Sequence, residues 1–483
     1  MACRWGEPSF ASRVWGRAPR SRCRASCAVS SAILVLALLL SCTAAEEHTT
    51  GPPPAAPTSS IVWITLDTVR ADHLGAYGYF RNTSPRFDAL ASESILFERA
   101  YSPIATTLPS HLSALTATYP NEHGVLANVR AGGKVFTPSE TLVSLAAFLE
   151  ERGYATAAFV SATPLKSWSG IQRGFADYDT PEGMIRQGDQ TVDLAIAWLK
   201  MHRGEKFFLW VHLFDAHAPY EPREGFDVFS GGPDLDRYMS DREIQETAHT
   251  LRGIPNDIRE TTDRYDGEIL FVDTQLGRML DALKAEDGDE DVAIVVMGDH
   301  GEGMGQHGVL RHGHIWGEQL HVPLLIQVPH EAPRRVSTLM SVVDLFPTLL
   351  GLVEVPDEDA YLGNVSGLDV LATDEESSLI LGQTSARLIN FGVPLTYSLT
   401  SGNWRFISSS DGHQKLFDLS TDPHELKDLA ASKPEVVTKL QAVLNRQVEM
   451  QHARHRELGG AGAGEIDKGM LNDLRALGYV EEP

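Results

Sequence analysis

The stretch "DVAIVVMGDHG" (residues 291–301) decides the fold, because an apolar run rich in β-branched residues leads directly into an Asp-His pair. Short runs of this kind are typical of buried strands. Similar runs occupy residues 60–67, 154–160, 206–215 and 322–328, and helical patterns lie between them. Strands that alternate with helices predict an α/β fold, in which a mainly parallel sheet is sandwiched by helices.

The character of the sequence changes toward its C-terminus. Residues 393–420 predict short antiparallel strands, with turns at Gly402 and Gly412. A helical pattern over 433–457 follows, and we interpret the glycine-rich "LGGAGAGE" (458–465) as a flexible break. The sequence therefore predicts a smaller C-terminal α+β subdomain that carries a short antiparallel sheet.

The first residues are typical of an export signal. Residues 1–41 combine an arginine-rich start with an apolar run that is short for a membrane span, and "LLSC" resembles a bacterial lipobox. We expect a lipoprotein-type signal peptide there and membrane attachment through a lipidated Cys42, on a bacterial periplasmic or cell-surface protein. Ordinary secretory cleavage is the alternative. Residues 42–59 predict a flexible linker, 60–372 the catalytic domain, and 373–483 the C-terminal subdomain with terminal helices.

Charge and cysteine usage limit the chemistry. The 483 residues carry a formal net charge of -24, which makes nucleic acid an unsuitable partner. All four cysteines lie at or before Cys42, so neither disulfides nor thiolate metal sites are expected in the body of the chain. A metal ion there has to bind carboxylates, histidines and hydroxyls.

Polar side chains follow two of the apolar runs directly. Asp67 comes after the first run, and Asp299 and His300 come after the run that opened this section. Ligands of open α/β sheets bind at the carboxyl ends of the strands. An Asp-His pair flanked by glycines suits a divalent cation. The same glycine-rich segment holds further candidate histidines, His307, His312 and His314.

A second group of candidates lies around "TLPSH" (107–111), which reads as the start of a helix. Pro109 suits a first helical turn, and the backbone N–H groups there attract anions. A hydroxyl that binds a divalent cation loses its proton more easily, which makes Thr107 a candidate nucleophile. A simple helix cap is the alternative. In "WVHLFDAHAPYEP" (210–222), His217 is a candidate for contact with substrate, whereas His212 is equally well a core histidine.

These motifs occur together in an order that resembles the sulfatase branch of the alkaline phosphatase superfamily. The resemblance covers residues 60–483 and implies an α/β sandwich followed by a smaller domain. The matching stretches are "LDTVRADHLGAYGY", "LPSHLSALTATYPNEHGV", "HLFDAHAPYEP", "GDHGEGMGQHG", "VVDLFPTLLGL", "LFDLSTDPHELKDLA" and "LRALGYV".

The resemblance also implies roles for single residues. It assigns Asp67, Asp299 and His300, together with the nucleophile Thr107, to one divalent metal ion, and manganese, zinc, magnesium and calcium are not distinguished. His217 matches the histidine that contacts the anionic group of the ester. The candidate catalytic and substrate contacts are Thr107, His217, His312 and His314, and His312 falls where many sulfatases have a lysine. A second metal site built on Asp215, His217 and His314 is less favoured.

Two departures from the family pattern shape the expected reaction. Sulfatases oxidise a cysteine or serine in Cys/Ser-x-Pro-x-Arg to formylglycine, whereas this chain has Thr107 and His111. Where many sulfatases carry Lys-x-His, it has "SATPL" (161–165), and Thr68 replaces a second metal-binding aspartate. A threonine nucleophile resembles the nucleotide pyrophosphatases and lipoteichoic acid synthases of the superfamily.

We therefore predict a sulfatase-like hydrolase of a small anionic ester or of a glycan or lipid substrate. Phosphoester or phosphodiester cleavage through Thr107 is favoured over sulfate ester cleavage. The alternatives are a transferase that moves a phospho-substituent on cell-surface lipid or glycan, and a catalytically lapsed fold that binds anionic glycans. The natural substrate and the oligomeric state do not follow from the sequence.

Overall fold

The computed structural model describes residues 60–130, 134–244, 257–285, 291–353, 365–372 and 379–465, with the single residues 469, 472 and 474. The expected signal peptide (1–41), Cys42 and the linker (42–59) lie outside these residues. The described residues belong to one compact unit, and the limits expected for the two domains stay a prediction. None of the helices described is long and apolar enough to cross a membrane.

An eight-stranded sheet forms the centre of the fold, in the order β12-β2-β11-β8-β1-β7-β5-β6. All neighbouring strands pair in parallel except β11, which runs antiparallel to β2 and β8. The expected mainly parallel sheet is thus confirmed. Its strands are β1 (Ser60–Leu66), β2 (Ile95–Phe97), β5 (Ala155–Val160), β6 (Asp177–Asp179), β7 (Phe207–Leu213), β8 (Val292–Gly298), β11 (Leu324–Gln327) and β12 (Arg334–Val336).

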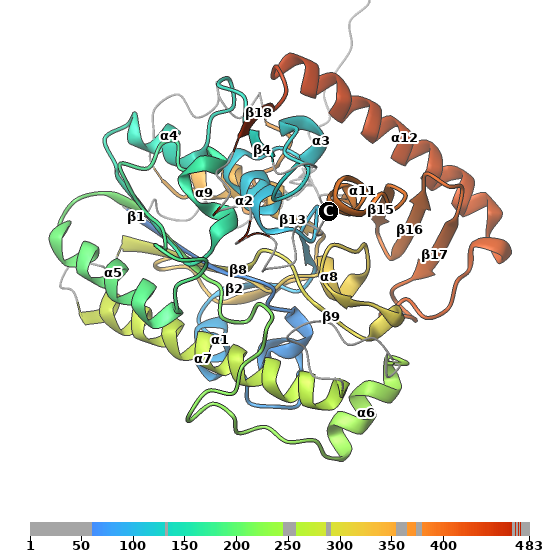
Figure 1. Cartoon of the computed structure of the whole chain (residues 1–483), viewed down its shortest axis with the longest axis horizontal. Coiled ribbons are helices and arrows are strands. Elements are labelled where there is room, and N and C mark those ends of the chain that lie inside the picture. The colour runs from blue at the N-terminus through green and yellow to red at the C-terminus, as the bar shows by residue number, and fades with distance from the viewer. Residues whose placement is uncertain are drawn as a thin grey trace, which may run out of the picture. The chain divides into compact units, whose positions relative to one another are not determined.

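Helices cover both faces of this sheet (Figure 1). Side chains alternate along each strand, so Ile61 and Trp63 of β1 enter one hydrophobic core while Val62 and Ile64 enter the other. The first core is completed by α2 (Thr107–Thr116), α4 (Leu145–Glu150) and α9 (Leu345–Leu350). The second is completed by α1 (Pro85–Ala91), α5 (Gly188–Met201) and α7 (Ile258–Ala285).

The sheet register fixes which chain segments meet at its carboxyl edge. Leu66 of β1 pairs with Gly298 of β8 on one side and with Leu213 of β7 on the other. The residues that follow these three strands therefore leave the sheet side by side. Asp67 and Asp299 are two of them, which brings the polar strand ends of the sequence to one place.

The smaller sheet is antiparallel, as expected, in the order β14-β15-β16-β17, and α12 packs beside it (Figure 1). Gly402 and Gly412 take positive φ values of 56° and 92° at its turns, a conformation that favours glycine. These elements span β14 (Ile380–Gln383), β15 (Thr396–Ser401), β16 (Trp404–Ser409), β17 (Gln414–Asp418) and α12 (Pro434–Glu457).

One stretch differs from its sequence interpretation. The expected flexible break at 458–465 contains β18 (Gly462–Glu465), which pairs antiparallel with β4 (Lys134–Thr137). A Cβ on Gly464 would lie 2.9 Å from a Val135 methyl, so the glycine allows the two strands to approach. The remaining elements include α3 (Pro120–His123), α6 (Pro233–Asp241), α8 (Gly317–Leu320), α11 (Ser385–Phe391), and the paired strands β3 (Ala100–Tyr101) with β13 (Met340–Ser341) and β9 (Gly303–Met304) with β10 (Leu310–Arg311).

A buried ion pair joins the small sheet to the segment before β11. Arg405 of β16 pairs with Glu425, and the two residues are 1% and 3% exposed. Arg405 also donates to the carbonyl of Ile315, and Glu425 accepts the N–H of Gly317 at 3.0 Å. The pair therefore fixes the backbone that follows the candidate histidines of the 300–314 segment.

We expect Arg405→Met to lower the free energy of unfolding by about 3 kcal/mol, because it leaves the Glu425 charge buried without its partner. Arg405→Met combined with Glu425→Gln should lose less, since that charge is gone. Urea unfolding followed by fluorescence measures both, with the exposed Arg446→Met as control. A double variant less stable than the single one would contradict this account.

Candidate active site

Asp67, Asp299 and His300 form a buried cluster at the carboxyl edge of the main sheet. One ligand atom from each lies within 4.8 Å of the others, and all three residues are fully buried. Within the described part of the chain, this is the one group of three or more such residues arranged to hold a metal ion. The structure thus brings together three residues that are 233 positions apart at most along the chain.

Hydrogen bonds from neighbouring groups aim one atom of each residue at the centre of the cluster. The Nδ1–H of His300 donates to the backbone carbonyl of Gly301 at 3.0 Å. Its Nε2 therefore carries no proton and has a lone pair free to bind a metal ion. Asp299 Oδ1 accepts the N–H groups of Thr68 at 3.1 Å and of His300 at 2.7 Å. His212 Nε2 donates to Asp67 Oδ2 at 3.2 Å, so His212 positions a ligand of this cluster.

The atoms that remain have no hydrogen-bond partner. They are Asp67 Oδ1, Asp299 Oδ2, His300 Nε2 and the Thr107 hydroxyl, all buried. Buried polar atoms are nearly always hydrogen-bonded, so four orphaned atoms on this expected ligand set call for an explanation. Three oxygens and one imidazole nitrogen are a donor set that a divalent cation binds well. The residues present therefore fit the metal ion that the sequence implies.

The electrostatics of the cluster point the same way. Burial raises the pKa of Asp67 well above its usual range. The nearby Thr107 hydroxyl lowers that pKa in part, although the two side chains form no hydrogen bond of normal geometry. Burial, and then the charge of Asp67, also raises the pKa of Asp299. Burial and neighbouring His312 lower the pKa of His300 and keep it neutral. Two buried carboxylates and a neutral imidazole together lack a compensating cation.

Thr107 is the first residue of α2, and its helix start differs from the expected anion site. Thr106 precedes it as the N-cap residue, without a capping hydrogen bond from its side chain. The N–H of Leu108 donates to Asn128 Oδ1 at 2.8 Å, and that of Ser110 donates to the Thr106 carbonyl. Pro109 has no N–H, so few backbone donors are left for an anion.

Asn128 places a side-chain N–H donor beside Thr107, and the sequence analysis did not single it out. Its Oδ1 accepts from Leu108, which fixes the amide orientation and leaves Nδ2 as a buried donor without a partner. Asn128 is 1% exposed and lies next to the helix start that carries Thr107. An isolated asparagine 21 residues beyond the nucleophile carries no signal of its own in the sequence.

His217 and His312 face one another beside the cluster. Their Nε2 atoms are 3.2 Å apart, and the ring of His312 lies 4.6 Å, centroid to centroid, from that of His300. The Nδ1 atoms contact the carbonyls of Ala218 and Ala105. Burial lowers the pKa of His312 to about 4 and that of His217 well below its usual range, so neither imidazole is permanently charged.

The other candidates lie apart from the cluster. Asp215 accepts the N–H of Gly188 and pairs with Arg223, while His314 lines a neighbouring cavity. The second metal set of Asp215, His217 and His314 is therefore not assembled in the described structure. The roles predicted for His217, His312 and His314 stay predictions.

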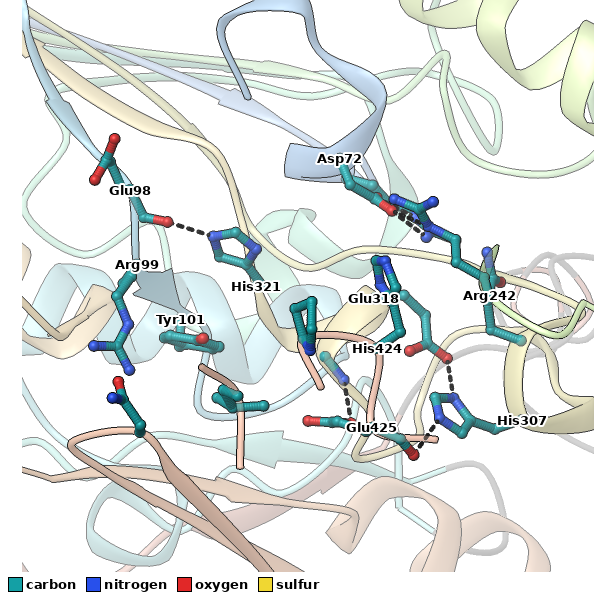
Figure 2. A pocket seen from close by; sticks show the side chains of 16 residues that line it. Asp72, Glu98, Arg99, Tyr101, Arg242, His307, Glu318, His321, His424 and Glu425 are labelled. Atoms are coloured by element: carbon teal, nitrogen blue, oxygen red, sulfur yellow. Dashed lines mark hydrogen bonds and ion pairs between the residues drawn. The ribbon is translucent and has the colours of Figure 1, made fainter. Parts of the chain in front are cut away.

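His307, singled out in the sequence with the other histidines, belongs to a separate cavity of about 390 Å³. Figure 2 shows it between Glu318 and Glu425: Nδ1 contacts Glu318 Oε1 at 3.2 Å, and Nε2 contacts the Glu425 carbonyl at 3.3 Å. In the same cavity Arg70 and Arg242 both pair with Asp72. These charged groups thus pair with neighbouring protein groups and hold segments of the chain together.

His111 stands where the sulfatase pattern has arginine, and it is buried in an aromatic environment. Its ring centroid lies 5.2 Å from that of Trp210 and 5.1 Å from that of His212. Its Nδ1 donates to the Thr107 carbonyl and its Nε2 accepts from the Thr65 hydroxyl. Burial lowers its pKa well below the usual range, so it adds no positive charge to the site.

With this geometry established, comparison with known proteins places the chain. A family model described as sulfatase matches residues 59–355, more than half of the sequence. The chain belongs to the sulfatase family. The enzyme class expected from the sequence, a sulfatase-like hydrolase, agrees with this membership.

Individual relatives of this sulfatase-family chain are more distant. Arylsulfatase K from Gallus gallus is 33% identical over 204 residues, which cover 39% of this chain and 37% of the relative. The chain thus spans less than half the length of the first curated relatives that it matches.

Solved structures share the fold. A phosphonate monoester hydrolase of Agrobacterium radiobacter aligns with a TM-score of 0.65 at 21% identity, covering 82% of this chain and 96% of that one. A protein in complex with its substrate D-glucosamine-2-N,6-O-disulfate aligns with a TM-score of 0.65 at 17% identity, covering 83% and 98%.

We expect a divalent cation to raise the melting temperature, because an ion that binds only the folded chain adds about 2.7 kcal/mol at a hundredfold excess over its Kd. Asp299→Asn should lose most of this shift. Asp344→Asn is the control, since Asp344 is a buried carboxylate that accepts two backbone N–H groups elsewhere. Thermal unfolding with and without Mn²⁺ measures the shift, and an undiminished shift in Asp299→Asn would contradict this ligand set.

Proposed function

We propose that the chain is an exported, metal-dependent hydrolase that cleaves a phosphoester or phosphodiester through Thr107. The observation that carries the proposal is the Thr107 hydroxyl, which is buried without a hydrogen-bond partner beside the Asp67 carboxylate. A hydroxyl needed only to cap a helix would bond to the backbone, and this one does not. Membership of the sulfatase family supports ester hydrolysis in general.

The residues around Thr107 have separate roles in the proposed reaction. Asp67, Asp299 and His300 would hold the cation, which would lower the pKa of a hydroxyl and stabilise negative charge on the ester. The Thr107 oxygen forms the bond to phosphorus, and the Asn128 amide donates to a phosphoryl oxygen. The Nε2 atoms of His217 and His312 lie 3.2 Å apart. His312 is neutral and its Nδ1 contacts the Ala105 carbonyl, so its Nε2 takes up the proton that Thr107 releases and returns it to the departing ester oxygen.

The identity of the nucleophile favours phosphorus over sulfur. Formylglycine carries a geminal hydroxyl whose collapse expels sulfate, and threonine has no such second hydroxyl. An ester on Thr107 must therefore be released by attack of water on its central atom. Phosphoryl groups undergo that second in-line displacement readily with positioned donors and a cation. We accordingly place phosphate esters ahead of sulfate esters as substrates.

Thr107→Val should lower the turnover of 4-nitrophenyl phosphate and bis(4-nitrophenyl) phosphate by at least about 10³-fold, because the side chain keeps its shape but loses the attacking oxygen. Thr106→Val is a matched control, since that neighbouring hydroxyl makes no capping hydrogen bond. Mass spectrometry of the quenched wild type should find a phosphoryl group on Thr107. Turnover of 4-nitrophenyl sulfate alone, or full activity in Thr107→Val, would overturn the proposal.

We also propose that the protein is anchored at a bacterial cell surface through Cys42. The arginine-rich start, the apolar run and the "LLSC" ending support this location. Expressed in a bacterial host, the wild type should fractionate with membranes and incorporate labelled palmitate. Cys42→Ala should be recovered without label in the soluble fraction, and equal labelling of both proteins would rule out this anchor.

A further inference from the structure

A cavity of about 240 Å³ lies beside the candidate active site, between the catalytic segment and the small sheet. His314, one of its lining residues, is two positions beyond His312, whose ring contacts those of His217 and His300. The cavity thus adjoins the segment that carries His312, on the side toward the small sheet.

Arg387 is the distinctive side chain of this cavity. It lies on α11, and its stem packs over Gly313, where an added Cβ would lie 3.4 Å from Arg387 Cγ. Gly313 has a φ of +97°, which itself favours glycine, so the chain is suited to this close approach. The positive charge of Arg387 lies near enough to both neighbouring histidines, His312 and His314, to lower their pKa values beyond the effect of burial.

The guanidinium of Arg387 has no acidic partner among the described residues. Its Cζ lies over the ring of Phe391, at 5.6 Å from the centroid. The side chain is partly buried, and burial lowers its pKa because no carboxylate offsets the loss of water. In the cavity of Figure 2, by contrast, Arg70 and Arg242 pair with Asp72. A partly buried arginine without a counterion favours binding of an external anion.

Hydrogen bonds join the backbone around Arg387 to the segments before and after α2, and they fix the position of Arg387 relative to the candidate site. Ser385 Oγ donates to the carbonyl of Leu126 at 2.9 Å, and the N–H of Gln383 donates to the carbonyl of Pro103 at 2.9 Å. Pro103 lies two residues before Ala105, whose carbonyl contacts His312. The same segment therefore holds both α11 and the histidine next to the reacting ester.

The rest of the lining matches an anion carried on a compact body. Lys415 adds a second cation and lies over the Trp316 ring at 5.5 Å from its centroid. Val393, Pro394 and Ile407 contribute apolar surface, and none of the described lining residues is an aspartate or glutamate. A volume of about 240 Å³ is suited to a single ring rather than to a long chain.

We propose that Arg387 and the cavity around it form a subsite for a second negative charge, so that the preferred ester carries two anionic groups on one ring-sized body. The proposal rests on the function proposed above only for the first group, which binds at Thr107. The second group binds Arg387 and is not cleaved. Arg387 thereby selects doubly anionic substrates without taking part in the reaction.

Calorimetric titration of the full-length protein with Mn²⁺ tests this selection, with glucose 1,6-bisphosphate and glucose 6-phosphate as probes and with Thr107→Val in every protein compared, so that neither probe is cleaved. The wild type should bind the bisphosphate at least about tenfold more tightly than the monophosphate, which corresponds to about 1.4 kcal/mol. Arg387→Met should remove this preference and leave the affinity for glucose 6-phosphate unchanged. Arg387→Lys should restore part of it, and the exposed Arg446→Met should behave as the wild type.

Two outcomes would overturn the subsite. One is an equal preference for the bisphosphate in wild type and Arg387→Met; the other is an equal loss of affinity for both probes, which would make Arg387 a structural residue. Because binding is measured without turnover, an inactive protein that keeps the Arg387-dependent preference would refute the proposed hydrolysis and support the subsite.

Discussion

The negative charges of Asp67 and Asp299, both fully buried at the ends of adjacent parallel strands, are the constraint on which the rest of the site depends. Two such carboxylates are costly in a protein interior unless a cation lies between them. The surrounding groups serve that need, since His212, Thr68 and the backbone of His300 each occupy an outer oxygen and leave an inner one free. Because the two carboxylates repel an anion, the proposed function requires that the ester bind only with the cation in place.

Much of this arrangement follows from sequence patterns that reflect strong physical effects. Buried strands require apolar runs, and polar residues directly after them mark the carboxyl edge, so Asp67, Asp299 and His300 were accessible from the chain alone. The reversed direction of β11 was not, because a short apolar run is compatible with either direction. The pairing of β18 with β4 was also missed, since glycine-rich segments lack the side-chain pattern that identifies a strand.

In the candidate site, too, some residues could be predicted from the sequence and others could not. Residue type and position singled out the proposed metal ligands and Thr107. The amide of Asn128 could not be singled out, because only its bond to Leu108 leaves the amide nitrogen without a partner. Arg387 lies 280 positions after Thr107, and its isolation from carboxylates is a property of three-dimensional packing. The departure at His111 is informative for another reason: a neutral ring packed near Trp210 replaces a cation, so positive charge at this site has to come from elsewhere.

The ion pair between Arg405 and Glu425 makes the candidate site depend on the C-terminal part of the chain. A chain synthesised as far as residue 372 already contains every proposed metal ligand and the nucleophile, but neither member of that pair. The backbone at Ile315 and Gly317, next to His312 and His314, gains its anchors only when β16 and the segment after β17 have folded. The backbone beside His312 and His314 therefore reaches the geometry described here only when the C-terminal part of the chain is in place.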